Sequence, residues 1–217
     1  MIVLKFGGTS VGTAESIQKV DKIITETKGL KIVVLSAVSG TTNALVEICN
    51  NLQAGLKDDA LLSVHQLHNS YLNLINDLYT SVLYKEKSRS FISIKFDGLR
   101  SLIQNADGND LDKIIVAQGE ILSTNLMQLY LEEKAISSSL ISALDFIHID
   151  KKEEPKVVHI SEKLHPILNT NLTQDLWITQ GFICTNSKGE IDNLQRGGSD
   201  YTASLIGAAM QANEVQI

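Results

Sequence analysis

Cysteine and proline are scarce in this sequence, which has two of each among 217 residues. Cys49 and Cys184 lie far apart and without CxxC spacing, so the sequence supports neither a disulfide framework nor a zinc site, and we expect two buried free thiols. Pro-rich linkers, internal repeats and low-complexity runs are also missing. The chain is therefore expected to form one domain, and its 43% apolar content is enough for a substantial core.

Long apolar runs and an excess of positive charge are missing as well. No run approaches the roughly 20 apolar residues that span a bilayer, and Lys5 follows the apolar N-terminal residues instead of preceding them. The formal net charge of −6 argues against a protein that binds nucleic acid regardless of sequence, because such binding needs clustered Lys and Arg. We therefore expect a cytoplasmic protein that has neither a membrane nor a nucleic acid as partner.

The first 38 residues have the pattern of a βαβ unit. Residues 1–6 and 31–38 are apolar runs typical of buried strands, and the apolar residues between them recur at helical spacing. Thr13 is a suitable N-cap for this helix, and Gly29 is a suitable residue to end it. The pattern predicts an α/β fold with a mainly parallel sheet.

Helical spacing dominates from residue 43 to about residue 106, which predicts a helical excursion from the sheet. Its clearest amphipathic stripe consists of Leu61, Val64, Leu67, Tyr71, Leu74, Leu78 and Val82. Within the excursion, residues 91–96 alternate apolar and polar side chains but lead directly into helical spacing. That stretch is compatible with either a strand or a helix.

The second half of the chain alternates again between strand and helix signals. We predict a helix over residues 120–132 and another that begins near Asp200. Strands are predicted over residues 136–141, 156–160, 176–183 and 214–217, the last of which looks cut off by the end of the chain.

A cation and a glycine pair stand at the first predicted strand-to-helix turn. The residues there are Lys5, Phe6, Gly7, Gly8, Thr9 and Ser10. Glycine N–H groups can approach an anion closely, the following helix presents its positive end, and the lysine supplies a mobile charge. The turn suits a phosphate, although an ordinary tight turn with a surface lysine fits these residues equally well. It is not a Walker A loop, because Thr13 stands where that motif has lysine.

A second cation-and-glycine turn precedes the last predicted helix. It consists of Arg196, Gly197, Gly198, Ser199 and Asp200. A guanidinium can hold a carboxylate through two hydrogen bonds, while the Ser and Asp side chains can cap the helix or face a ligand. The alternative is a solvated arginine beside a plain helix cap. Two such turns in one chain favour a binding function.

Five segments resemble motifs of the aspartate kinases, in the order that this family has them. They are KFGGTS at 5–10, VLSAVSGTTN at 34–43, QGEILST at 118–124, ITQGF at 178–182 and RGGSDYTA at 196–203. The resemblance covers essentially the whole chain. It implies the amino acid kinase fold, which is an αβα sandwich around a mainly parallel sheet.

The resemblance also implies roles for individual residues. It assigns the ATP phosphates to Lys5, Gly7, Gly8, Thr9 and Ser10. It places Ser36 and Thr42 along the aspartate site, Glu120 at the substrate ammonium and Arg196 at the substrate α-carboxylate, with Gly197, Gly198 and Ser199 beside them. Lys5 and Asp200 are the expected catalytic residues.

The implied activity is ATP- and Mg²⁺-dependent phosphorylation of the side-chain carboxylate of L-aspartate. The product, 4-phospho-L-aspartate, serves lysine, threonine and methionine synthesis in this family. The residue types suit this reaction, because a carboxyl group with a pKa of about 3.9 is already an anionic nucleophile and needs no catalytic base. What remains is to bring two anions into line and to stabilise the transferring group with cations, backbone amides and Mg²⁺.

Other functions stay open at this point. They are a kinase of the same fold that acts on glutamate, acetylglutamate or carbamate, and a noncatalytic amino-acid sensor. Pairing Glu120 with Arg196 favours a free amino acid, because acetylation removes the ammonium group. The presence of Lys5 and Asp200 argues against a sensor, which could lose both.

The sequence departs from the family in two respects. Gln195 stands where the family usually has glycine, which puts the approach of Arg196 in doubt. Family members also continue past the position of Ile217 with residues that hold the nucleotide and with regulatory ACT domains. We therefore expect residues 1–217 to be the N-terminal part of a catalytic domain, inactive alone, from a homo-oligomeric parent.

Overall fold

The protein is built around a parallel β-sheet. The computed structural model describes residues 1–106, 111–150, 154–171, 173–194 and 197–217. In this part of the chain the main sheet has five strands in the order β3-β4-β2-β1-β7, and every neighbouring pair is parallel. The strands are β1 (Ile2–Phe6), β2 (Lys31–Leu35), β3 (Ser139–Ile141), β4 (Leu176–Gln180) and β7 (Glu214–Gln216).

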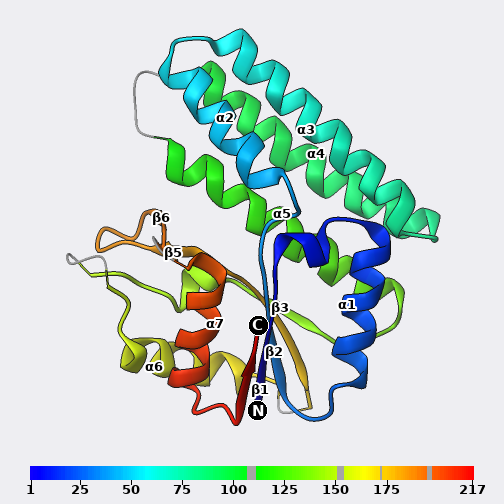
Figure 1. Cartoon of the computed structure of the whole chain (residues 1–217), viewed down its shortest axis with the longest axis vertical. Coiled ribbons are helices and arrows are strands. Elements are labelled where there is room, and N and C mark those ends of the chain that lie inside the picture. Colours follow the sequence, from blue (N-terminus) through cyan, green and yellow to red (C-terminus); the bar gives the residue numbers. More distant parts are fainter. Residues whose placement is uncertain (107–110, 151–153, 172, 195–196) are drawn as a thin grey trace.

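Helices cover both faces of this sheet (Figure 1). One face packs against α1 (Ala14–Glu26) and α5 (Asp112–Glu133), and the other packs against α6 (Val157–Leu168) and α7 (Gly198–Ala209). Because strand side chains alternate between faces, neighbours in β2 enter different cores. Val33 packs with the α1 and α5 side, and Val34 packs with the α6 and α7 side. The predicted αβα sandwich with a mainly parallel sheet is confirmed.

The predicted helical excursion forms a bundle beyond the carboxyl ends of the strands (Figure 1). It contains α2 (Thr41–Gln53), α3 (Lys57–Leu78) and α4 (Val82–Gln104), which pack with the N-terminal part of α5. The stripe from Leu61 to Leu78 faces the bundle core or its margin, whereas Val82 is exposed at the start of α4. Residues 91–96, which the sequence left open, are helical.

Four short elements complete the described fold. A 3-10 turn, η1 (Gly8–Val11), follows β1, and a second, η2 (Ala143–Asp145), follows β3. The strands β5 (Ile183–Thr185) and β6 (Ile191–Asn193) form an antiparallel pair after β4. Thr13 caps α1 by accepting a hydrogen bond from the Ser16 N–H at 3.2 Å, as predicted.

One predicted strand is wrong, and several predicted bounds shift. Residues 156–160 begin helix α6, whose apolar residues Ile160, Leu164 and Leu168 are buried at four-residue spacing, while Val158 is exposed. Residues 156–160 are rich in β-branched side chains, which is typical of a strand, and the helical period becomes visible only when the residues up to Leu168 are included. The predicted strand 31–38 ends at Leu35, 136–141 shortens to β3, and 176–183 divides between β4 and β5. The predicted helix 120–132 begins eight residues earlier, at Asp112, and the predicted strand 214–217 is β7.

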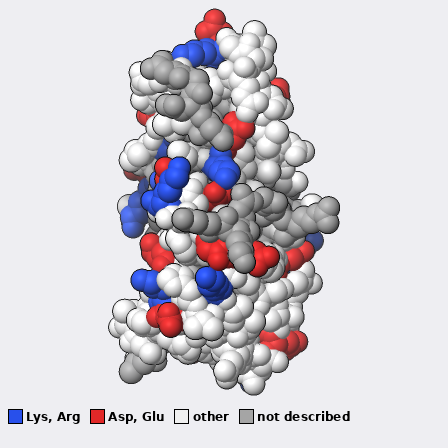
Figure 2. Space-filling model, turned by 90° about the vertical axis from the view of Figure 1, so that its left-hand side faces the viewer, with Lys and Arg blue, Asp and Glu red and all other residues white. Residues whose placement is uncertain are grey.

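Both cysteines are buried free thiols, as expected from the sequence. Within the described residues, no helix combines the length and the apolar content that crossing a membrane requires. On the face shown in Figure 2, Lys and Arg lie close to Asp and Glu, so the described part of that face carries mixed charge.

The double-sided burial of β2 predicts equal sensitivity on its two faces. Val33→Ala and Val34→Ala should each lower the free energy of unfolding by about 2 kcal/mol, because each removes two fully buried carbons and leaves a cavity. Ile94→Ala, at a position 68% exposed in α4, should change it by less than about 0.5 kcal/mol. Urea denaturation followed by circular dichroism measures all three. A neutral Val34→Ala variant would show that helices do not cover the second face.

Candidate active site

The candidate site lies where three neighbouring strands end. β1, β2 and β4 run parallel and end at Phe6, Leu35 and Gln180, so their following turns meet at one edge of the sheet. Ligands of open α/β sheets bind in the crevice outside these carboxyl ends. The predicted motifs at residues 5–10, 34–43 and 178–182 are therefore neighbours in space.

Lys5 and Asp200 form an ion pair across this edge. The Lys5 Nζ lies 2.5 Å from Asp200 Oδ1, and the two side chains are 13% and 51% exposed. Lys5 is carried by β1, and Asp200 lies in the first turn of α7, where the helix dipole favours a negative charge. The structure thus brings together the two predicted catalytic residues, which are 195 positions apart in sequence and stand on different elements.

The first glycine turn is packed directly against the segment that follows β2. A Cβ atom on Gly8 would lie 2.9 Å from the Ala37 carbonyl oxygen, and one on Gly12 would lie 3.0 Å from the Ser39 Cβ. The Ser39 N–H also donates to the Gly8 carbonyl oxygen at 3.1 Å. Glycine is therefore required here by the close approach of two backbone segments, independently of any phosphate.

A pocket opens on the other side of this turn. It has a volume of about 330 Å³ and is lined by Lys5, Gly7 and Ser10 together with Gln216, the last residue of β7, and Ile217. Thr9 is exposed in η1. The pocket places the lysine and the glycine turn at a common opening, as a site for phosphate groups requires.

Ser36 and Ser199 connect the end of β2 to the start of α7. The Ser36 Oγ donates to the Ser199 Oγ at 2.9 Å, and the Ser123 Oγ of α5 donates to the Ser36 carbonyl oxygen at 2.6 Å. A Cβ atom on Gly181 would overlap Ser199, so this position in the turn after β4 also requires glycine. Both predicted serines are thus held at the meeting point of β2, β4 and α7.

Glu120 places a carboxylate in the interior beside the same turn. It is 4% exposed, and its Oε1 accepts a hydrogen bond from the Ala37 N–H at 3.2 Å. Its Oε2 is buried and has no hydrogen-bond partner among the described residues. Burial raises the pKa of Glu120 from 4.5 to about 7, and the Ala37 hydrogen bond only partly opposes this effect. A cationic ligand group beside Oε2 would stabilise the ionised carboxylate.

The second glycine turn begins α7 in an unusual backbone conformation. Gly197 has φ +74° and Gly198 has φ +33°, values that side chains rarely tolerate. Phe182, after β4, also has positive φ, and its N–H donates to the Thr202 Oγ1 at 3.0 Å. Arg196 and Gln195 lie outside the described residues, so the carboxylate clamp at Arg196 stays a prediction.

Some residues that shape the site were not predicted. One of them is Thr41, which is buried with its Oγ1 3.0 Å from the Tyr71 OH. The predicted Thr42, its neighbour, is exposed in the first turn of α2. The helical spacing of Tyr71 predicts a place on an amphipathic stripe, and Ser123 and Thr202 lie within the motifs at 118–124 and 196–203 without an expected role of their own. Their partners belong to other elements, so no local pattern could show these contacts.

The described residues contain no group of three or more His, Cys, Asp or Glu that could hold a metal ion by itself. Asp200 is a carboxylate that reaches the predicted phosphate turn through its contact with Lys5. A Mg²⁺ ion that is bound mainly by phosphates and water needs only one or two protein carboxylates, so the residues present are compatible with it.

Comparison with known proteins gives a consistent result. The model of the amino acid kinase family matches residues 1–217. Lysine-sensitive aspartokinase 3 of Escherichia coli is 30% identical over 220 residues, which cover 100% of this chain and 48% of that protein. A bifunctional aspartokinase/homoserine dehydrogenase of Buchnera aphidicola is 34% identical over 230 residues, which cover 100% of this chain and 28% of that protein.

Solved structures show the same similarity in three dimensions. Escherichia coli aspartokinase III in complex with lysine and aspartate superposes with a TM-score of 0.88 at 29% identity, over 99% of this chain and 48% of that one. The complex of the same enzyme with aspartate and ADP gives a TM-score of 0.83 with the same coverage. The chain thus spans about half the length of these aspartokinase chains.

The raised pKa of Glu120 predicts a pH-dependent cost of burying it. The folded-state pKa lies above the unfolded value, so this contribution favours the folded state below pH 4.5 and is lost as the pH rises toward 7. Glu120→Gln cannot titrate, and its stability relative to the wild type should therefore rise by about 3 kcal/mol between pH 4.5 and pH 8. Denaturant titrations of both proteins across this range measure the difference. Parallel pH profiles would show that the Glu120 carboxylate is not the buried, half-paired group described above.

Proposed function

The chain belongs to the amino acid kinase family, and from this membership we propose that the protein phosphorylates the side-chain carboxylate of L-aspartate with ATP. The product would be 4-phospho-L-aspartate, which begins the synthesis of lysine, threonine and methionine. The similarity to aspartokinases along the whole chain supports this substrate over glutamate, acetylglutamate or carbamate. The chain spans 48% of the Escherichia coli aspartokinase and 28% of the bifunctional Buchnera aphidicola enzyme, so the proposal concerns the whole protein that carries this chain.

The observation that carries the proposal is the half-paired carboxylate of Glu120. Its Oε1 is occupied by the Ala37 N–H, and its buried Oε2 has no hydrogen-bond partner among the described residues. An α-ammonium group is a compact cation with three N–H donors, which matches the Oε2 oxygen in charge and in hydrogen bonding. Binding of the α-ammonium group would also give the buried carboxylate a partner of opposite charge, which removes the cost of burying it unpaired. A free amino acid satisfies this site, whereas an N-acetylated one does not.

The phosphate side of the site consists of Lys5 and the first glycine turn. In the proposed reaction a side-chain carboxylate oxygen of aspartate attacks the γ-phosphorus of ATP. The bond from that phosphorus to the ADP oxygen breaks, and ADP leaves with the electron pair, so no proton transfer is required. Lys5, held at the edge of the sheet by Asp200, would stabilise the negative charge on the transferring oxygens.

Asp200 is the described residue suited to hold Mg²⁺, either directly or through water. Bound there, the ion would neutralise phosphate charge that Lys5 alone cannot. That the whole protein is a cytoplasmic homo-oligomer stays a prediction from sequence.

Aspartate-dependent release of ADP by the full-length protein with Mg-ATP tests the proposal. Aspartate should support turnover, and glutamate, N-acetylglutamate and carbamate should not. Lys5→Ala should lower kcat at least about a hundredfold and leave the KM for aspartate within about twofold, because a cation directed at the phosphate acts in the transition state. Lys22→Ala, in the exposed Lys22–Glu26 pair on α1, is the matched control and should behave like the wild type.

Two results would contradict this account. Turnover with another acceptor but not with aspartate would show that the substrate is wrong. Near-normal kcat in the Lys5→Ala variant would remove Lys5 from the mechanism.

A further inference from the structure

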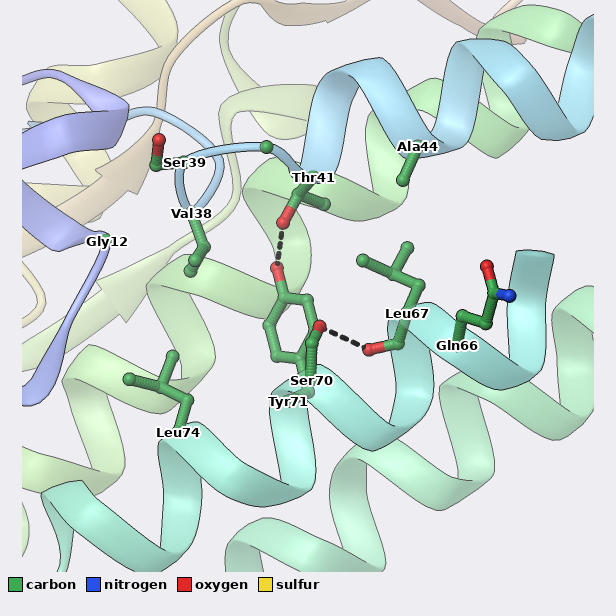
Figure 3. Close-up of a pocket in the computed structure, with 11 residues that line it drawn as sticks. Gly12, Val38, Ser39, Thr41, Ala44, Gln66, Leu67, Ser70, Tyr71 and Leu74 are labelled. Atoms are coloured by element: carbon green, nitrogen blue, oxygen red, sulfur yellow. Dashed lines mark hydrogen bonds between the residues drawn. The ribbon is translucent and has the colours of Figure 1, made fainter.

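A tyrosine of the helical bundle reaches the candidate site through one hydrogen bond. Tyr71 lies in α3 and Thr41 begins α2, and their hydroxyl oxygens are 3.0 Å apart (Figure 3). Both residues are 1% exposed. Burial raises the pKa of Tyr71 above its ordinary value, so the phenol keeps its proton at neutral pH and can act as a donor.

Thr41 closes the segment that forms one wall of the site. We define residues 36–40, between β2 and α2, as the site loop. Within it, Ser36 contacts Ser199, the Ala37 N–H contacts Glu120, and the Ser39 N–H contacts the Gly8 carbonyl oxygen. The Thr41 N–H donates back to the Val38 carbonyl oxygen at 2.9 Å. Movement of Thr41 would therefore shift the backbone that holds Glu120.

Thr41 also lies beside the turn of α5 that carries Glu120. A Cβ atom on Gly119 would lie 3.4 Å from the Thr41 Cγ2 and 2.8 Å from the Ala37 Cβ. The methyl group of Thr41 thus packs near Gly119, while its hydroxyl group is held by Tyr71. One residue links the bundle, the site loop and the residue before the buried carboxylate.

Packing alone does not fill the space between Tyr71 and the site loop. A pocket of about 380 Å³ lies there, bordered by Val38 and Ser39 of the site loop and by Leu67 and Leu74 of α3 (Figure 3). On the bundle side, the Tyr71 ring is fixed by an edge contact with Phe96 of α4, with centroids 5.9 Å apart. The hydroxyl pair is therefore a directional contact at the border of this pocket.

We propose that Tyr71 is a positioning residue for the amino-acid site, which acts through Thr41 to hold the site loop against Glu120. This inference rests on the proposed function. Within the described residues the Tyr71 hydroxyl is tied to Thr41, and Thr41 is tied to the loop that holds Glu120, so the main effect should fall on aspartate. The helical bundle thereby contributes to recognition of the amino acid without contacting it.

Kinetics of the full-length protein test the consequence of this tie. Tyr71→Phe removes only the hydroxyl group and should raise the KM for aspartate about three- to tenfold, with kcat and the KM for ATP within about twofold of wild type. Thr41→Val should have the same effect. The KM of the double variant should be no higher than that of either single variant, because both substitutions remove the same hydrogen bond. Thr41→Ser keeps the hydroxyl group, so its KM for aspartate should stay close to the wild-type value.

Tyr79→Phe is the matched control. The Tyr79 hydroxyl donates to the Leu126 carbonyl oxygen at 2.6 Å, and this tyrosine is also 1% exposed, but its partner lies away from the site loop. Tyr79→Phe should lower stability about as much as Tyr71→Phe and leave the KM for aspartate unchanged. Equal effects of the two variants on this KM would overturn the proposal, because Tyr71 would then be an ordinary structural residue.

Amide hydrogen exchange tests the tie without substrate. Tyr71→Phe and Thr41→Val should accelerate exchange at residues 36–42 relative to Tyr79→Phe, and unchanged exchange there would refute the proposal. Faster exchange in a protein that does not turn over aspartate would instead support the tie and refute the proposed function.

Discussion

The hydrogen bond from the Ala37 N–H to the Glu120 carboxylate is the constraint on which the site depends. It joins the loop after β2 to the middle of α5, and both partners are buried. A buried carboxylate with a single N–H donor is costly, and its raised pKa reflects that cost. The fold holds the group in this state by packing around it, so a cationic ligand group gains more here than it would at the surface.

Several positions around this hydrogen bond require glycine because the neighbouring elements approach one another closely. Gly8, Gly119 and Gly181 lie where a Cβ atom would collide with Ala37 or with Ser199. Glycine-rich motifs are commonly interpreted as phosphate cradles, and Gly7 and Gly8 remain suited to that role. In this protein glycine also allows β1, β2, β4 and α5 to bring their functional residues within hydrogen-bonding distance. The same residues thus serve both packing and binding, which is why motif and fold coincide at this edge of the sheet.

The sequence predicted the layers of the fold and the site residues that belong to contiguous motifs. Period-two and period-3.6 patterns were sufficient for the parallel sheet and the helical excursion. They failed at residues 156–160, because the helical period of α6 is set by Leu164 and Leu168, which lie beyond this β-branched stretch. Contacts between elements could not be predicted in this way. The pairing of Lys5 with Asp200 is a matter of topology, and the tie between Tyr71 and Thr41 joins a residue assigned to the core with one beside the predicted Thr42.

The most direct test compares aspartate with succinate, which has the same two carboxylates but no amino group. Calorimetric titration of the full-length protein should show aspartate binding at least about tenfold more tightly than succinate, because only aspartate offers a charged hydrogen bond to Glu120. In Glu120→Gln, with its folding checked by circular dichroism, the two affinities should come within about threefold of each other. Equal binding of both ligands to the wild type, or a preference that persists in Glu120→Gln, would contradict the assignment of Glu120 to the substrate ammonium.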